Sequence, residues 1–148
     1  MTILPKTSKP TPAEEKRAYK IATDRDGGDI VDGGICQRCL RDCGMGVTSR
    51  DHRKGRGVGG LTTAANLQVL GGTGTTGCHG WATTHPEEAL AEGWAVPSWA
   101  DPLVWPARRW CLDNHNALKL RWCLYDNKGG VHWITDEEAA RRMNGMVS

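Results

Sequence analysis

The chain has 148 residues and a formal net charge of +2, a size that suits one domain or a compact core with an appendage. It contains no run of about 18 consecutive apolar residues, which excludes an ordinary membrane-spanning helix, and the start, Met1 to Lys6, lacks the apolar core of a secretory signal. We therefore expect a cytoplasmic protein with no membrane partner, whose six cysteines stay reduced and available to a metal.

The first half of the chain predicts a capped helix followed by a strand pair. Residues 1–12 are rich in Pro, Thr and Lys and are expected to form a flexible arm. Thr11 and Glu14 match a capping box and predict a helix that runs to about Thr23. The elements expected next are an Asp- and Gly-rich loop at 24–34, a strand at 47–51, a glycine-rich loop at 55–60 and a strand at 67–70.

The second half predicts two short helices, an extended segment and a second hairpin. One helix is expected to begin near Cys78, and another to run from Pro86 to Glu92, where Gly93 ends it. Residues 94–110 are rich in Pro and Trp and are expected to wrap the core as an extended segment. The last elements expected are an alternating, half-buried strand at 118–125, a return strand at 131–134 and a final short helix capped by Thr135 and Glu138.

Four polar residues carry the chemistry that a nuclease needs: Asp51, His52, Asn66 and His79. Hydrolysis of a phosphodiester requires a base that activates water and a divalent cation that takes up charge on the phosphate. An imidazole with a pKa of about 6.5 can take that proton at neutral pH. Taken singly, these residues are better explained as a turn, a surface histidine or the end of a loop. Taken together and in order, they favour a metal-dependent nuclease.

The surrounding motifs resemble those of the HNH endonucleases, which have a ββα-metal fold, and especially the branch found in bacteriophage and prophage genomes. The resemblance spans roughly residues 35 to 93. It rests on Asp51-His52-Arg53, on Gly59-Gly60, on Asn66-Leu67 with Leu70, and on Gly77-Cys78-His79-Gly80-Trp81.

The resemblance implies an α+β fold with a small ββα-metal core at residues 13–93. An N-terminal helix precedes the site hairpin, and residues 94–148 form an extension, with a β-hairpin and a short helix, that packs on the core. The activity implied is metal-dependent hydrolysis of DNA. The partners implied are DNA and, by analogy with phage members, a terminase or other genome-packaging proteins.

The resemblance also implies a role for each polar residue. His52 becomes the general base, while Asp51 and His79 become ligands of a divalent cation, Mg²⁺ or Mn²⁺. Asn66 either fixes the loop or joins the metal shell.

Two positions depart from the family pattern. Colicin-type members carry a second metal-binding histidine one helical turn after the first, where this chain has Thr83. His85 is a further candidate, or a helix-start residue ahead of a proline. The phage branch places a second cysteine after the Asn-Leu-x-x-Leu run, where this chain has Gly71.

The cysteines form a second constellation, which predicts a structural zinc site. Thiolates at C-x2-C spacing can close on a tetrahedral ion. The clustered thiols equally suit free cysteines on a loop. Cys111 and Cys123 lie in apolar, strand-like segments and are expected to be buried thiols. The candidate zinc ligands are Cys36, Cys39, Cys43 and Cys78.

Positive charge gathers around the expected base. Residues 1–60 hold twelve Lys or Arg against eight Asp or Glu, whereas the remainder is net negative. A charge run is more often a solvated face, but its position beside His52 favours contact with a phosphate backbone. The residues expected to bind DNA are Arg50, Arg53, Lys54 and Arg56.

A protein of another class remains open on the sequence. A zinc-knuckle module could bind nucleic acid or protein through a scaffold held by the four cysteines, without cutting anything. Such a module has no need for Asp51 and His52 together with His79, so these three residues discriminate between the two hypotheses.

Overall fold

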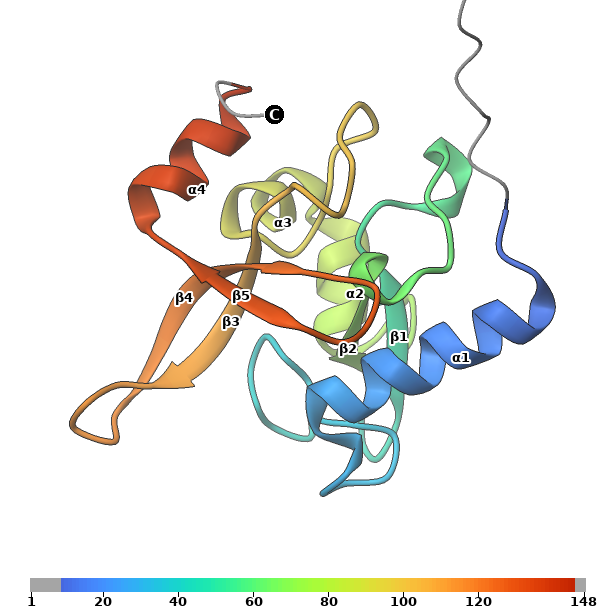
Figure 1. Cartoon of the computed structure of the whole chain (residues 1–148). Coiled ribbons are helices and arrows are strands. Elements are labelled where there is room, and N and C mark those ends of the chain that lie inside the picture. Colours follow the sequence, from blue (N-terminus) through green and yellow to red (C-terminus); the bar gives the residue numbers. More distant parts are fainter. Residues whose placement is uncertain (1–8, 146–148) are drawn as a thin grey trace, which may run out of the picture.

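The computed structural model describes residues 9–145, which fold into four α-helices and two antiparallel sheets (Figure 1). The α+β expectation is therefore confirmed. Most of the expected arm, residues 1–8, lies outside the described part. Within that part, no helix has the length and apolar character needed to cross a membrane. In chain order the elements are α1 (Pro12–Thr23), β1 (Thr48–His52), β2 (Leu67–Gly71), α2 (Gly77–Thr84), α3 (Pro86–Glu92), β3 (Ala107–Leu112), β4 (Leu118–Tyr125), β5 (Val131–Ile134) and α4 (Asp136–Met143).

Helix α1 begins at the predicted cap. The hydroxyl of Thr11 accepts the N–H of Glu14 at 3.2 Å, and the Glu14 carboxylate accepts the N–H of Thr11 at 3.0 Å. A plain loop was expected after this helix. The structure has instead a π-helical turn, Asp24–Gly28. Gly27 closes that turn with a φ of +96°, a conformation that favours glycine. The turn carries Asp26 into the protein interior.

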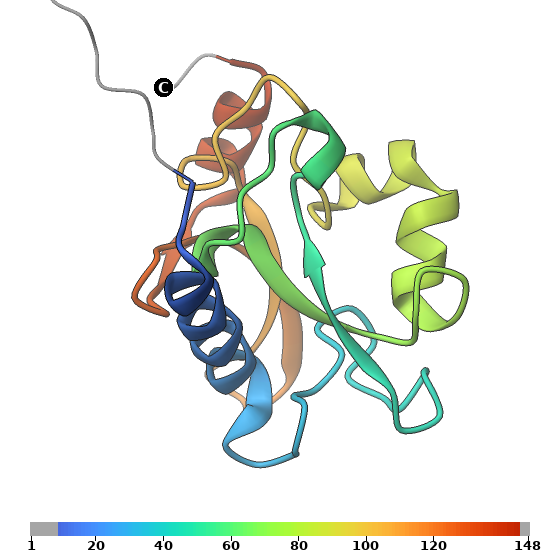
Figure 2. The ribbon, with the colours of Figure 1, turned by 90° about the vertical axis from the view of Figure 1, so that its right-hand side faces the viewer.

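Strands β1 and β2 form a hairpin that lies between α1 and α2 (Figure 2). Successive side chains of a strand point to opposite faces. Leu67 therefore packs against Ala22 of α1, while Leu70 packs against Cys78 of α2. Both faces of β2 are covered, and all five of its residues are buried. The two strands match their predicted positions to within about one residue, the usual uncertainty of an element end.

Helix α2 follows the hairpin after a turn at residues 72–76, and α3 follows α2 after a sharp turn at His85. His85 occupies the N-cap position of α3, which matches the helix-start alternative. Its ring stacks on Trp81 with the ring centroids 5.4 Å apart. Gly93 ends α3 in the left-handed conformation, as predicted.

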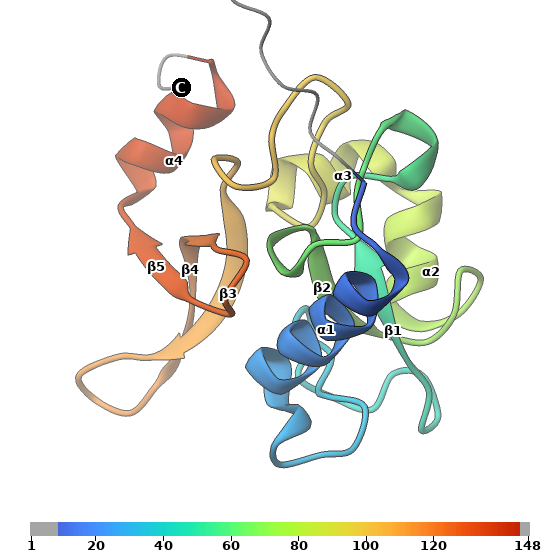
Figure 3. The ribbon, with the colours of Figure 1, turned by 45° about the vertical axis from the view of Figure 1, so that its right-hand side comes forward.

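The second sheet has the strand order β3-β4-β5 and lies, with α4, on the other side of the molecule from α2 and the hairpin (Figure 3). Strands β4 and β5 and the final helix were expected, but β3 was not. The segment 94–110 ends in a strand because its backbone pairs with β4, Ala107 lying opposite Cys123. The end of β4 buries both faces, since Tyr125 and Cys123 lie in the interior together with Trp122.

A buried charged network joins the two sheets. Asp26 is 0% exposed and accepts hydrogen bonds from Arg25, from Arg109 of β3 at 2.6 Å and from the N–H of Val69 in β2. The Arg25 guanidinium also lies 3.8 Å from the ring centroid of Tyr125 in β4. Burial raises the pKa of Tyr125 to about 12, so its hydroxyl stays protonated. This network fixes the hairpin against the second sheet.

Candidate functional site

A carboxylate and an imidazole meet where β1 ends and α2 begins. His79 Nε2 lies 3.3 Å from Asp51 Oδ1, although the two residues are far apart in the sequence. Gln68 stands opposite Asp51 in the hairpin register, and its Nε2 donates to Asp51 Oδ2 at 3.0 Å. The same amide donates to the carbonyl of Trp94 at 2.6 Å. Gln68 therefore fixes the orientation of the carboxylate toward His79.

The surroundings of the His79 ring decide which of its two nitrogens could bind a cation. Nδ1 is buried and has no hydrogen-bond partner among residues 9–145. Nε2 is turned to Asp51, so it is the nitrogen that could share a cation with the carboxylate. The hydrogen bond to Asp51 raises the pKa of His79, while partial burial opposes that rise. In the absence of a cation the two side chains form an ion pair when His79 is protonated.

His52 is the last residue of β1 and projects from the face opposite to Asp51. Its Nε2 lies 2.9 Å from the Thr62 hydroxyl and 3.3 Å from Nε of Arg56. The ring of Tyr19 meets the imidazole edge-on, with the centroids 6.4 Å apart. Burial, followed by the charge of Arg56, lowers the pKa of His52, which favours a neutral imidazole. A neutral imidazole can accept a proton.

Asp51 and His52 line the same cleft, although strand alternation sends them to opposite faces. The strand ends at His52, and the chain turns away there, so the cleft reaches both side chains. Its volume is about 440 Å³, and its other walls come from α2, α3 and the segment 94–98. This volume lies within the range of about 300 to 1,000 Å³ that is typical of ligand sites.

Asn66 clamps the loop between the two strands. Its Oδ1 accepts the N–H of Lys54 at 2.7 Å, and its Nδ2 donates to the carbonyls of Lys54 and Leu61. Both amide hydrogens and the oxygen are therefore engaged with the backbone. Of the two roles open on the sequence, this geometry favours the role of fixing the loop over that of a metal ligand.

Arg53 does not face solvent, contrary to the expectation that it contacts DNA. Its side chain is only 2% exposed, and burial lowers its pKa to about 10. A guanidinium in this position cannot reach a phosphate backbone. It instead binds the second half of the chain to the hairpin, through the carbonyls of Ala65, Pro102, Trp105 and Pro106.

Arg50 also differs from the DNA-contact expectation. Its guanidinium is half-buried and donates to Thr23, to Thr48 and to the carbonyl of Gly33, so it fastens β1 to the loop after α1. Lys54 is half-buried, whereas Arg56 is exposed on the loop beside His52. The Nζ of Lys54 donates to the carbonyl of Ala100, so of the four residues expected to bind DNA only Arg56 is exposed.

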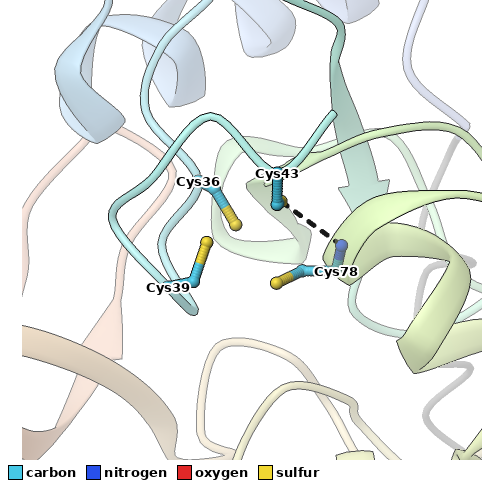
Figure 4. A group of neighbouring side chains, drawn as sticks. All are labelled: Cys36, Cys39, Cys43 and Cys78. Atoms are coloured by element: carbon cyan, nitrogen blue, oxygen red, sulfur yellow. Dashed lines mark hydrogen bonds between the residues drawn. The ribbon is translucent and has the colours of Figure 1, made fainter. Parts of the chain in front are cut away.

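The four cysteines expected to form one cluster do lie together. Every pair of their sulfur atoms is within 4.8 Å, and Figure 4 shows the sulfurs turned toward a common space between a loop and the start of α2. Sulfurs at about 2.3 Å from a tetrahedral zinc lie about 3.8 Å apart, so a small contraction suffices. The cluster could therefore hold a structural metal such as zinc. Its members are Cys36, Cys39, Cys43 and Cys78.

Cys43 occupies the space that a side chain at position 71 would need. A Cβ built on Gly71 would overlap Cys43 Sγ. The sulfur of Cys43 thus takes the place next to Cys36 that a cysteine at position 71 would otherwise fill. Hydrogen bonding by the Cys78 thiol, and then by backbone N–H groups that include Gly71, lowers the pKa of Cys36, which favours a thiolate. Cys39 completes the knuckle from the same loop.

The remaining two cysteines lie apart from this cluster. Cys123 is buried, as expected, and burial raises its pKa to about 11. Cys111 is only half-buried. Cys111 lies in β3 and Cys123 in β4, so both belong to the second sheet and not to the metal cluster.

Two residues of the site escape the sequence reasoning. Gln68 orients Asp51, and the hairpin register was the signal that could have found it, because the two residues pair directly. Thr62 holds His52, but it lies in an irregular loop with no pattern that marks it.

Comparison of the chain with protein-family models, with curated proteins and with solved structures gives no match.

Proposed function

We propose that the chain is a metal-dependent endonuclease of the HNH type that hydrolyses DNA phosphodiester bonds. The observation that carries this proposal is the approach of Asp51 Oδ1 to His79 Nε2 at 3.3 Å, beside a cleft that Asp51 and His52 line together. A hairpin followed by a helix is the arrangement expected of a ββα-metal core, and β1, β2 and α2 have that order.

Asp51 and His79 would hold the divalent cation, Mg²⁺ or Mn²⁺. A carboxylate oxygen and an imidazole nitrogen suit such ions and leave most of the coordination sphere open. The bound cation would stabilise negative charge on the phosphate and on the leaving oxygen. Gln68 holds the carboxylate in place from behind, as groups that surround metal ligands commonly do.

His52 takes the proton from the attacking water. We assign Nε2 as the basic nitrogen, because it accepts the Nε–H of Arg56 at 3.3 Å and lies 2.9 Å from the Thr62 hydroxyl, which leaves the hydrogen of the neutral ring on Nδ1. Asn66 keeps the following loop, and with it Arg56, in position. The exposed Arg56 guanidinium turns from His52 to the incoming phosphate, where positive charge stabilises the reacting group.

Nicking of supercoiled plasmid tests this function. Purified protein with added Mg²⁺ or Mn²⁺ is expected to nick the plasmid, and His52→Ala is expected to reduce the rate by about 10²- to 10⁴-fold, the usual contribution of a general base. His115→Ala, at an exposed histidine between β3 and β4, is the matched control and should keep the wild-type rate. Equal rates for wild type and His52→Ala would contradict the proposal.

A zinc-stabilised binding module is the second candidate, and the cysteine cluster favours it. In that case Cys39→Ser should abolish DNA binding, because the knuckle opens, whereas His52→Ala should bind like wild type. No variant, nor the wild type, would then cleave under any metal condition. Binding is measured by fluorescence anisotropy of a labelled duplex.

A further inference from the structure

An exposed tryptophan stands over a second cleft beside the catalytic loop. Trp99 is 69% exposed, more than any other tryptophan of the chain. Its ring is nevertheless held, because Trp105, which is 6% exposed, meets it edge-on with the centroids 5.2 Å apart. A large apolar ring fixed in solvent offers a flat surface on which another ring can stack.

Two glycines of the glycine-rich loop line the same cleft as Trp99. Gly59 and Gly60 line it together with Leu61, Thr63 and Asn66, and the cleft volume is about 510 Å³. Gly59 has a φ of +93°, and no atom lies within 4 Å of a Cβ built there, so the wall opens into free space. A Cβ at Gly60 would overlap the Lys54 carbonyl oxygen. The loop therefore requires glycine at both positions, by its φ at Gly59 and by its close approach to Lys54 at Gly60.

Three contacts fix this cleft relative to the catalytic residues. Lys54 Nζ donates to the carbonyl of Ala100, next to Trp99, at 3.0 Å. The residue before Lys54, Arg53, donates to the carbonyl of Pro102 and accepts the N–H of Val96 at 2.7 Å. The tryptophan platform and the strand that carries His52 are thus parts of one hydrogen-bonded unit.

Polar groups at the rim suit the edge of a base. Asn127 lines the cleft, and its Oδ1 accepts the N–H of Ala65 at 3.0 Å. Its Nδ2 makes no hydrogen bond to any residue within 9–145 and remains a donor. Nucleobase edges present nitrogen and oxygen acceptors to such donors. The carboxylate at the rim, Asp101, is turned to the N–H of Leu103 at 2.9 Å.

We infer that the cleft between Trp99 and the glycine-rich loop binds an unpaired nucleobase of the DNA strand that is cut. This inference rests on the proposed function and names the form of its substrate. Stacking of a base on an indole needs a free base face, and the bases of an intact duplex have both faces covered by their neighbours. The site therefore prefers single-stranded or frayed DNA next to the scissile phosphate.

Oligonucleotide binding tests the inference. The affinity of the full chain for a fluorescently labelled 15-nucleotide single strand is compared with that for the blunt duplex of the same sequence, with no Mg²⁺ or Mn²⁺ added. Trp99→Ala should weaken single-strand binding by about 5- to 150-fold, the effect of losing one base stack. Trp99→Phe, which keeps an aromatic face, should stay within about threefold of wild type. Duplex binding should be the same in all three proteins.

Trp133→Ala is the matched control, since Trp133 is a partly exposed tryptophan on β5. It should bind the single strand like wild type. Unchanged affinity in Trp99→Ala, or a wild type that binds the single strand no tighter than the duplex, overturns the inference. An RNA strand of the same sequence forms a second arm, and tighter Trp99-dependent binding of RNA than of DNA would overturn the choice of DNA.

The plasmid assay separates this inference from the proposed function. Trp99-dependent binding of the single strand by a protein that never nicks DNA would support the cleft and refute the nuclease. If the protein nicks DNA with added metal but Trp99→Ala binds the single strand as tightly as wild type, the result would support the nuclease and refute base binding in the cleft.

Discussion

Replacement of Asp26 by asparagine is expected to lower the free energy of unfolding by about 3 to 5 kcal/mol, the usual effect of breaking a buried ion pair. The carboxylate accepts two hydrogen bonds from Arg25 at 2.9 Å, one from Arg109 at 2.6 Å and one from the N–H of Val69 at 3.0 Å. Asparagine keeps one acceptor oxygen and turns an NH₂ group toward donors. Two largely buried guanidinium groups then lose their counter-charge.

Urea denaturation measures this loss, and a thermal melt should show the midpoint falling by roughly 6 to 20 °C for a chain of this size. Asp24→Asn is the matched control. Asp24 lies two residues away and pairs with Lys20 at the surface, so its removal should change stability by no more than about 1 kcal/mol. A loss in Asp26→Asn as small as that of the control would refute the reasoning.

The same substitution has a pH signature. Burial alone would raise the pKa of Asp26, but the hydrogen bonds and charge of Arg25, with those of Arg109, outweigh burial and lower it. A depressed folded pKa contributes stability that is full above the unfolded value of about 3.9 and disappears as the pH falls through the folded value. The stability difference between wild type and Asp26→Asn should therefore be largest near neutral pH. It should begin to shrink as the pH falls below about 4.

The remaining predictions concern the base and the cysteine cluster. Thr62→Val should slow plasmid nicking by about 10- to 100-fold and alter the pH–rate profile, because the His52 ring loses its partner, whereas Thr62→Ser should restore most of the rate. For the zinc proposed at the cluster, Cys43→Ala should lower the zinc content found by metal analysis below one per chain. Gly71→Cys added to Cys43→Ala should restore one zinc per chain, since the two side chains compete for one space. Zinc retained in full by Cys43→Ala would contradict its assignment as a ligand.

Signals that act within a few residues predicted most of the regular elements. The capping pairs at Thr11 and Thr135 mark the starts of α1 and α4, and Gly93 marks the end of α3. Strand β3 was not predicted, because it is a strand only through its pairing with β4. The Pro- and Trp-rich segment before it carries no alternating pattern, and only pairing with β4 makes it a strand.

Burial of charge was the feature least visible in the sequence. Arg53 adjoins His52 in a basic run, but the carbonyls of Trp105 and Pro106 that surround it lie about fifty residues away. Asp26 likewise belongs to an Asp- and Gly-rich stretch that reads as a solvated loop, and its partner Arg109 sits on the unpredicted strand. Local composition records that a charge exists, whereas the tertiary fold decides whether it meets solvent.

In the candidate site, too, some residues could be expected from the sequence and others only from the tertiary fold. The cysteine cluster was expected from the C-x2-C spacing of Cys36 and Cys39 and from the place of Cys78 beside His79, with Cys43 as the candidate for the fourth position, and the four sulfurs do lie together. The pairing of Asp51 with His79 was expected from family resemblance, and its geometry follows from α2 packing on the hairpin. Gln68 and Thr62 support the site from positions that no motif marks.

A double-mutant cycle on plasmid nicking tests the central claim most directly, namely that Asp51 and His79 hold one cation. Rates in the presence of Mn²⁺ are compared for wild type, Asp51→Asn, His79→Ala and the double variant. If the two side chains share a metal, the double variant should be no slower than the slower single variant, because the site is already lost. Independent effects that multiply in the double variant, or single variants that nick like wild type, would contradict the account.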